Sequence, residues 1–310
     1  NKMIAFFANI FGYVLNFIYN FVKNYGLAII IFSILVKLMM IPISIKQQKT
    51  MKKSTKIQKK MKEIQFKYKN NPEQLNQATM ELYKSENMSP FSGCFSAIAQ
   101  IILLFAVFYL VRSPLTYMTK VDGVVVDKYT KIIRENDLST NSAYPQIEII
   151  REIENIRNLR NNINDNEDQN TDLSEINDDE LNSLYINMDF LGLNLAQVPT
   201  KSSDWKAYII PVLYVVVSII SMRITNPTKR QEKQENLEEN EDEKSLAKPE
   251  DDFDPMAQMN KNMNMMFPIM YVAVALVAPL GLALYWLMNS LLMIIERLIL
   301  NKLLKDEEEE

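Results

Sequence analysis

The stretch Leu27–Ile45, LAIIIFSILVKLMMIPISI, decides the fold of this chain because it is apolar and long enough to cross a bilayer. A membrane-spanning helix needs about 20 mostly apolar residues. Lys37 is the only charged residue of the stretch, and a Lys near the middle of a span costs roughly 2.5–3.5 kcal/mol on insertion scales. The next charged residue, Lys46, lies roughly 13 Å further along a helix, which is more than a Lys side chain can cover. We therefore expect Lys37 to mark a polar, hydrated place inside the membrane.

Further apolar stretches follow along the chain. No charged residue occurs between Lys261 and Glu296, and those 34 residues would be about 51 Å long as one helix, against about 30 Å of hydrocarbon. Pro279 and Gly281 break the stretch near its middle, so we expect two spans there. The sequence predicts an all-α integral membrane protein with five transmembrane helices around a hydrophilic groove. The five expected spans are 25–45, 91–111, 205–224, 262–279 and 280–297.

The segment before the first span, residues 1–24, carries one polar stripe. Asn9, Tyr13, Asn16 and Asn20 fall at helical spacing on an otherwise apolar segment. This pattern is typical of an amphipathic helix that lies at the membrane surface. We expect such an interfacial helix outside the cell; a full span is the alternative.

The charges of the connecting segments orient the spans. Residues 46–90 carry eleven Lys and four Glu, a net charge of +7, whereas residues 112–206 carry ten basic and seventeen acidic residues, a net charge of −7. The positive-inside rule places 46–90 in the cytoplasm. The sequence thus predicts a protein of the cell (plasma) membrane whose N-terminus lies outside and whose C-terminus is cytoplasmic.

The connecting segments differ in expected structure. Residues 46–90 are helical by pattern on both sides of Asn71-Pro72, which indicates a cytoplasmic helical hairpin with Pro72 at the start of its second helix. Residues 112–204 form a long extracytoplasmic loop, in which we expect one amphipathic helix, 146–163, and disorder over 164–182. The remaining segments are a charged cytoplasmic linker, 225–261, and an acidic cytoplasmic tail, 298–310.

Polar side chains recur at helical spacing on four of the spans and can line one common cavity. Ordinary packing between helices is the alternative for any single Ser. For Lys37 that alternative is weaker, because we expect no Asp or Glu inside the apolar stretches of the spans to neutralise it. The candidate groove residues are Lys37, Ser33, Ser96, Gln100, Ser218, Ser221, Tyr285, Trp286 and Asn289.

The composition argues against most catalytic chemistry. The chain has no histidine and a single cysteine, Cys94, which excludes His-based acid–base catalysis and a disulfide framework. We expect no cofactor, no metal and no enzymatic activity. The one catalytic alternative is a Ser33/Lys37 dyad at i, i+4, in which a neutral Lys acts as base for the Ser.

The order of motifs along the chain resembles the YidC/Oxa/Alb family of membrane protein insertases. The resemblance covers roughly 25–111, 186–225 and 258–300, and it depends on the combination rather than on any one motif. The residues that carry it are Tyr25-Gly26, Lys37, Pro42, Lys46-Gln47-Gln48, Lys67 to Glu73, Leu82-Tyr83-Lys84, Pro90, Gly93-Cys94, Gln100, Phe190-Leu191-Gly192, Phe267 to Met270, Pro279 to Trp286 and Asn289.

This resemblance implies a groove that is open to the cytoplasm and to lipid and closed outside. Lys37 stands where the family usually has Arg. The family moves short hydrophilic segments of new membrane proteins across the bilayer without ATP and releases their apolar segments to lipid. The implied partners are nascent membrane proteins and the Sec translocon. We expect no binding to DNA.

Two other properties follow from the residues themselves. The Lys-rich hairpin is cationic enough to contact anionic lipids or RNA. The ribosome is a further candidate partner, but residues 306–310 are all acidic, so we do not expect it to dock through the tail. A small transporter or channel with an anion site at Lys37, and a purely structural scaffold, remain alternatives from other functional classes.

Overall fold

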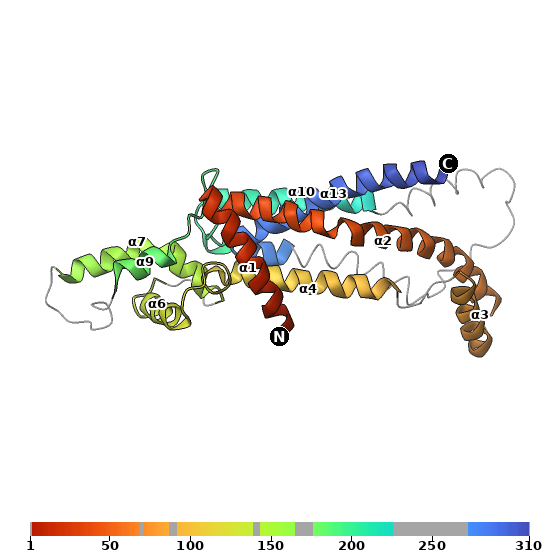
Figure 1. Ribbon diagram of the computed structural model, residues 1–310, viewed down its shortest axis with the longest axis horizontal. Coiled ribbons are helices and arrows are strands. Elements are labelled where there is room, and N and C mark those ends of the chain that lie inside the picture. The colour runs from red at the N-terminus through yellow and green to blue at the C-terminus, as the bar shows by residue number, and fades with distance from the viewer. Residues whose placement is uncertain are drawn as a thin grey trace.

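The computed structural model describes residues 2–68, 71–86, 92–138, 143–164, 176–225 and 272–309. Almost all of these residues lie in helices or in short connections between them. Four helices, α2, α4, α10 and α13, pack together along the long axis of the molecule (Figure 1). The bounds are α1 Lys2–Val22, α2 Tyr25–Lys67, α3 Pro72–Ser85, α4 Ser92–Arg112, α5 Pro114–Tyr117, α6 Gly123–Glu135, α7 Pro145–Asn164, α9 Asp178–Leu184, β1 Asp189–Phe190, β2 Leu193–Asn194, η1 Pro199–Lys201, η2 Trp205–Tyr208, α10 Ile209–Thr225 and α13 Leu280–Glu309.

The helices confirm the prediction of an all-α membrane protein. Three described helical segments are long and apolar enough to cross a bilayer: Lys2–Val22, Tyr25–Thr50 and Leu280–Leu300. Ile101–Arg112 and Trp205–Ser221 are shorter apolar helices. Most of the expected span 262–279 lies outside the described residues, although 272–277 are helical and a bend follows at Ala278. The predicted break at Pro279 is therefore present.

Helix α1 crosses the bundle at an angle and packs against α2 and α4 (Figure 1). Ala8, Leu15 and Ile18 are buried in this contact, and a Cβ atom on Gly12 would overlap the carbonyl of Tyr117. The opposite face exposes large apolar side chains. Those of at least 40% exposure are Met3, Phe6, Ile10, Tyr13, Phe17 and Phe21.

The polar stripe of α1 contacts Lys120, which lies outside this helix. Nζ of Lys120 lies 2.6 Å from Oδ1 of Asn9 and 4.3 Å from the ring centre of Tyr13. Burial lowers the pKa of Lys120. The position of α1 at the membrane surface stays a prediction; by length and composition it also satisfies the requirements of a span.

The first span and the first arm of the hairpin form one continuous helix, α2, of 43 residues. It starts at an Asn24 cap whose side chain accepts from the Leu27 N–H, and Pro42 does not end it. Helix α3 begins at Pro72, as predicted, with Asn71 as its cap. It reverses along the far part of α2, where Leu82 and Ile57 are buried.

Residues 112–204, called the outer segment after their expected side of the membrane, are more ordered than the sequence predicts. The expected helix 146–163 is present as α7, but α6 and α9 also form and pack on it. The expectation of disorder over 164–182 is wrong for 176–182, because Ile176 and Leu181 are buried. Ion pairs fix α9 on both neighbours: Lys128 to Glu180 at 2.9 Å and Arg160 to Asp178 at 2.6 Å.

A short segment beside the starts of α2 and α13 joins the first and last long helices. Asn187 accepts from the backbone N–H of Tyr25 at 3.0 Å and donates its own N–H to the Tyr19 hydroxyl at 2.8 Å. Ten residues later, Gln197 accepts from Leu280 at 2.9 Å. The β1–β2 hairpin lies between these two contacts, so this segment sets the relative depth of α2 and α13.

Candidate functional site

Helices α2 and α13 run in the same direction and contact each other at two levels. Near their starts, a Cβ on Gly281 would lie 3.3 Å from the ring of Tyr25. Further along, Nζ of Lys37 lies 2.6 Å from Oε2 of Glu296. The side chains of Lys37 and Glu296 are only 19% and 11% exposed. The central cation of the first span is thus paired with a carboxylate of the last helix.

The expectation that no carboxylate within the spans neutralises Lys37 is therefore wrong. In the sequence Glu296 ends the last apolar stretch, but α13 continues for more than three turns beyond it. Lys37 follows Tyr25 by twelve residues, about 18 Å of helix, and Glu296 follows Leu280 by sixteen, about 24 Å. The outer segment holds the two helix starts together, so Lys37 and Glu296 lie at somewhat different depths along the bundle. Their long side chains bridge that difference.

The carboxylate of Glu296 is only half satisfied by the described protein. Its Oε2 forms the ion pair with the Lys37 ammonium. Its Oε1 is buried and has no hydrogen-bond partner among the residues that the structure describes. A buried acceptor without a donor costs about 1–3 kcal/mol. Such a group is a place where water or a polar ligand can bind favourably.

Ser33 does not make a catalytic dyad with Lys37. The Ser33 side chain is buried, and its hydroxyl donates to the carbonyl of Ile29, one turn earlier on α2, at 2.7 Å. Lys37 is engaged by Glu296, and an ion-paired ammonium is a poor base. Both observations argue against the hydrolytic alternative.

Other predicted groove residues lie in the contact between α10 and α13. Ser218, Ser221, Tyr285 and Trp286 are buried, and the ring centre of Trp286 is 6.5 Å from that of Tyr214 on α10. Asn289 is partly exposed, one helical turn beyond Tyr285. Tyr285 and Trp286 are thus core side chains in this structure. Their role in contacting substrate stays a prediction.

Two predicted positions are described only by their backbone. Ser96 and Gln100 belong to α4, but their side chains lie outside the part of the chain whose side chains the structure describes. The structure thus brings Lys37 to Glu296 and Tyr214 to Trp286. Sequence reasoning missed Glu296. The signal that could have identified it is depth, since Glu296 lies about as far along the last span as Lys37 lies along the first.

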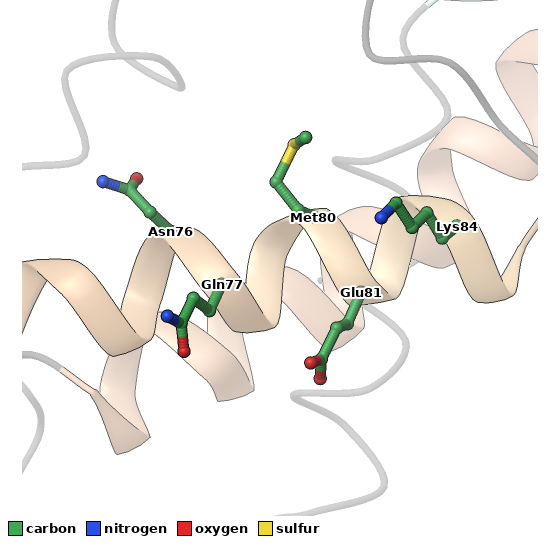
Figure 2. A pocket seen from close by; sticks show the side chains of 5 residues that line it. All are labelled: Asn76, Gln77, Met80, Glu81 and Lys84. Carbon is green, nitrogen blue, oxygen red and sulfur yellow. The ribbon is translucent and has the colours of Figure 1, made fainter.

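A shallow hollow on the hairpin is lined by α3 alone. Figure 2 shows its side chains, with Asn76 and Met80 directed to one side of the helix and Gln77 and Glu81 to the other. All are exposed. The α3 helix lies beside the far part of α2, away from the four packed helices (Figure 1). One exposed helix face of this kind is no enclosed site, and we assign no ligand to it.

Comparisons with known proteins give one family match over most of the chain and several similar proteins. A family described as 60Kd inner membrane protein matches residues 17–308. The chain is similar to the membrane protein insertase YidC of Chlorobaculum tepidum, 43% identical over 102 residues, which are 33% of this chain and 17% of that protein. The same-named protein of Caldanaerobacter subterraneus subsp. tengcongensis is 35% identical over 116 residues, 37% of this chain and 56% of that protein.

A third relative, the membrane protein insertase YidC of Syntrophus aciditrophicus, is 46% identical over 94 residues, 30% of this chain and 17% of its own length. These matches span from about a sixth to about half of the relatives' lengths. The family match is far longer than any of them and takes in α2, α4, α10 and α13 together with the outer segment. The chain therefore belongs to the 60Kd inner membrane protein family, the YidC/Oxa/Alb family of multi-pass membrane proteins.

Proposed function

We propose that this protein is a membrane protein insertase that moves short hydrophilic segments of nascent membrane proteins across the bilayer. The observation that carries the proposal is the Lys37–Glu296 pair, two charged groups between apolar helices α2 and α13. Charged groups within spans are costly and usually mark the path of a polar substrate. Membership of a family whose relatives are named insertases supports the same activity.

The proposed mechanism requires no covalent chemistry and no ATP. A polar, hydrated groove beside Lys37 shortens the apolar barrier that a hydrophilic tail must cross. An acidic residue of the tail can exchange with Glu296 for the ammonium of Lys37, since both interactions are ion pairs of the same kind. The candidate groove residues Ser33, Ser96, Gln100, Ser218, Ser221 and Asn289 would add polar contacts, and Tyr285 and Trp286 amphipathic surface for the apolar segment.

Topology and partners follow from the same proposal. The parallel course of α2 and α13 is compatible with five spans, an outer N-terminus and a cytoplasmic C-terminus. The Lys-rich hairpin of α2 and α3 would then receive substrate in the cytoplasm and contact anionic lipids. The Sec translocon is the expected protein partner, and the acidic tail argues against docking on the ribosome through that tail.

The transporter alternative is weakened by Glu296. An anion site needs a cation that is free to bind a solute, but a carboxylate of the same chain already lies 2.6 Å from the Lys37 ammonium. A small anion would have to displace a tethered group, which has the advantage of high effective concentration. A nascent tail is itself held nearby by its apolar segment and shares that advantage.

The test is insertion into vesicles that contain only the purified protein. The substrate is a single apolar span with a short acidic tail, added without ATP, and protection of the tail from external protease measures its crossing. The Lys37→Leu/Glu296→Leu double variant removes both charges at similar volume and should lose most of the protection. A Glu135→Gln variant at the end of α6, in the outer segment, is the control. Equal protection in protein-free vesicles would contradict the proposal.

A further inference from the structure

Within the Lys37–Glu296 pair the two opposite charges balance each other at rest. Lys37 and Glu296 lie 2.6 Å apart, and both side chains are largely removed from the surface. A lone cation at this depth would attract acidic tails and repel basic ones over several ångströms, because screening by salt is weak away from bulk water. A close ion pair presents instead a short dipole, whose field falls off much faster than that of a single charge.

We propose that Glu296 is a specificity-determining residue that lets the groove accept hydrophilic tails of either charge. This inference rests on the proposed insertase function and names its substrate class: apolar segments with acidic, neutral or basic tails. Glu296 cancels the selectivity that Lys37 alone would impose. It also supplies an acceptor that a cation-only groove lacks.

The geometry leaves both members of the pair able to bind a second group. An ammonium has three donors, and the contact with Oε2 of Glu296 takes one of them. The buried Oε1 of Glu296 has no donor among the described residues. An acidic or amide oxygen of one kind of tail can therefore bind the Lys37 ammonium. An amide or ammonium donor of another kind of tail can instead bind Oε1 of Glu296. In either case the incoming charge contacts the opposite charge of the pair.

The position of Glu296 favours contact with the passing tail. Glu296 lies seven residues after Asn289 and therefore shares a face of α13 with it. On α2, Ser44 lies seven residues after Lys37 and shares a face with that residue. Both Asn289 and Ser44 keep part of their exposure. The pair therefore lies on a polar line along two helices rather than as an isolated structural contact.

The test compares three substrates of equal length whose tails carry two Asp, two Asn or two Lys. Each is offered to purified protein in vesicles without a membrane potential, and protease protection gives the ratio of acidic to basic tails inserted. The parent protein should insert the three tails to similar extents. Glu296→Gln should raise the acidic-to-basic ratio about tenfold, the effect of about 1.4 kcal/mol, mainly by reducing insertion of the basic tail.

Other variants separate charge from fold. Glu296→Asp keeps the negative charge and should move the ratio less than Glu296→Gln, and the control Glu135→Gln should not move it. Lys37→Gln should shift the ratio in the opposite direction, towards basic tails, and decides the matter should Glu296→Gln fail to fold. Parental ratios in both single variants would overturn the proposal. Failure of the parent to insert any of the three tails would instead refute the proposed function.

Discussion

Gly26 packs directly against the ring of Phe190, although the two residues are 164 positions apart. A Cβ atom on Gly26 would overlap Cγ and Cδ2 of that ring. Gly26 is the second residue of α2, and Phe190 ends β1 in the outer segment. This contact, together with the hydrogen bonds of Asn187 and Gln197, holds the start of α2 beside the start of α13.

Gly26→Ala should destabilise the fold by about 1–3 kcal/mol, the usual cost of overpacking a well-filled site. Thermal unfolding in detergent measures the change. The matched control is Gly123→Ala at the start of α6, where a Cβ would meet nothing within 4 Å; it should be neutral or slightly stabilising. Equal unfolding temperatures for Gly26→Ala and the parent would show that the contact is loose.

Leu191→Asn should stabilise the protein. Leu191 and Gly192 form the two-residue turn between β1 and β2, and Leu191 adopts a φ of +51° with 88% of its side chain exposed. The left-handed conformation costs roughly 1–2 kcal/mol for an ordinary residue, and Asn-Gly is the preferred pair in such turns. We expect a gain of about 1 kcal/mol in unfolding free energy. Leu193→Asn, at a partly buried position, should lower stability, and a loss in both variants would contradict this reading of the turn.

Lys37→Ala should lower stability more than Lys37→Arg does. Removing one partner of a buried ion pair leaves the other charge uncompensated, which costs 3–5 kcal/mol when burial is complete; here the residual exposure should reduce the loss to roughly 2 kcal/mol. The Lys37→Ala/Glu296→Ala double variant should recover part of it. A double-mutant cycle by thermal unfolding measures the coupling, and additive losses would mean that the pair contributes nothing.

Deleting residues 50–84 should leave a stable membrane protein that inserts substrates poorly. The described contacts of the hairpin join its own two arms: Lys60 to Glu86 at 2.5 Å and the Thr79 hydroxyl to the Met61 sulfur at 3.5 Å. Little packing on the bundle would therefore be lost. Protease protection of a substrate tail measures insertion, with Glu81→Gln on the exposed face of α3 as control. Normal insertion by the deletion variant would remove the hairpin from the mechanism.

Local patterns in the sequence predicted the elements but not how they meet. The apolar length of 25–45, the break at Pro279 and the Asn71-Pro72 helix start each depend on a few neighbouring residues, and each is present. The order of 176–182 was missed because only Ile176 and Leu181 bury apolar surface in a strongly polar stretch. The Lys37–Glu296 pair depends on the relative depth of two helices, and the outer segment that sets this depth is distant in sequence from both charges.

The most direct test of the central claim is whether a hydrophilic tail passes the Lys37 face of α2. A photoreactive residue at Ser44 shares that face and leaves the ion pair intact, whereas one at Leu38, which is 61% exposed, points away from it. With a substrate arrested during crossing, Ser44 should capture the hydrophilic tail and Leu38 should capture lipid or the apolar segment. Tail capture at Leu38 and none at Ser44, with insertion intact, would contradict the account.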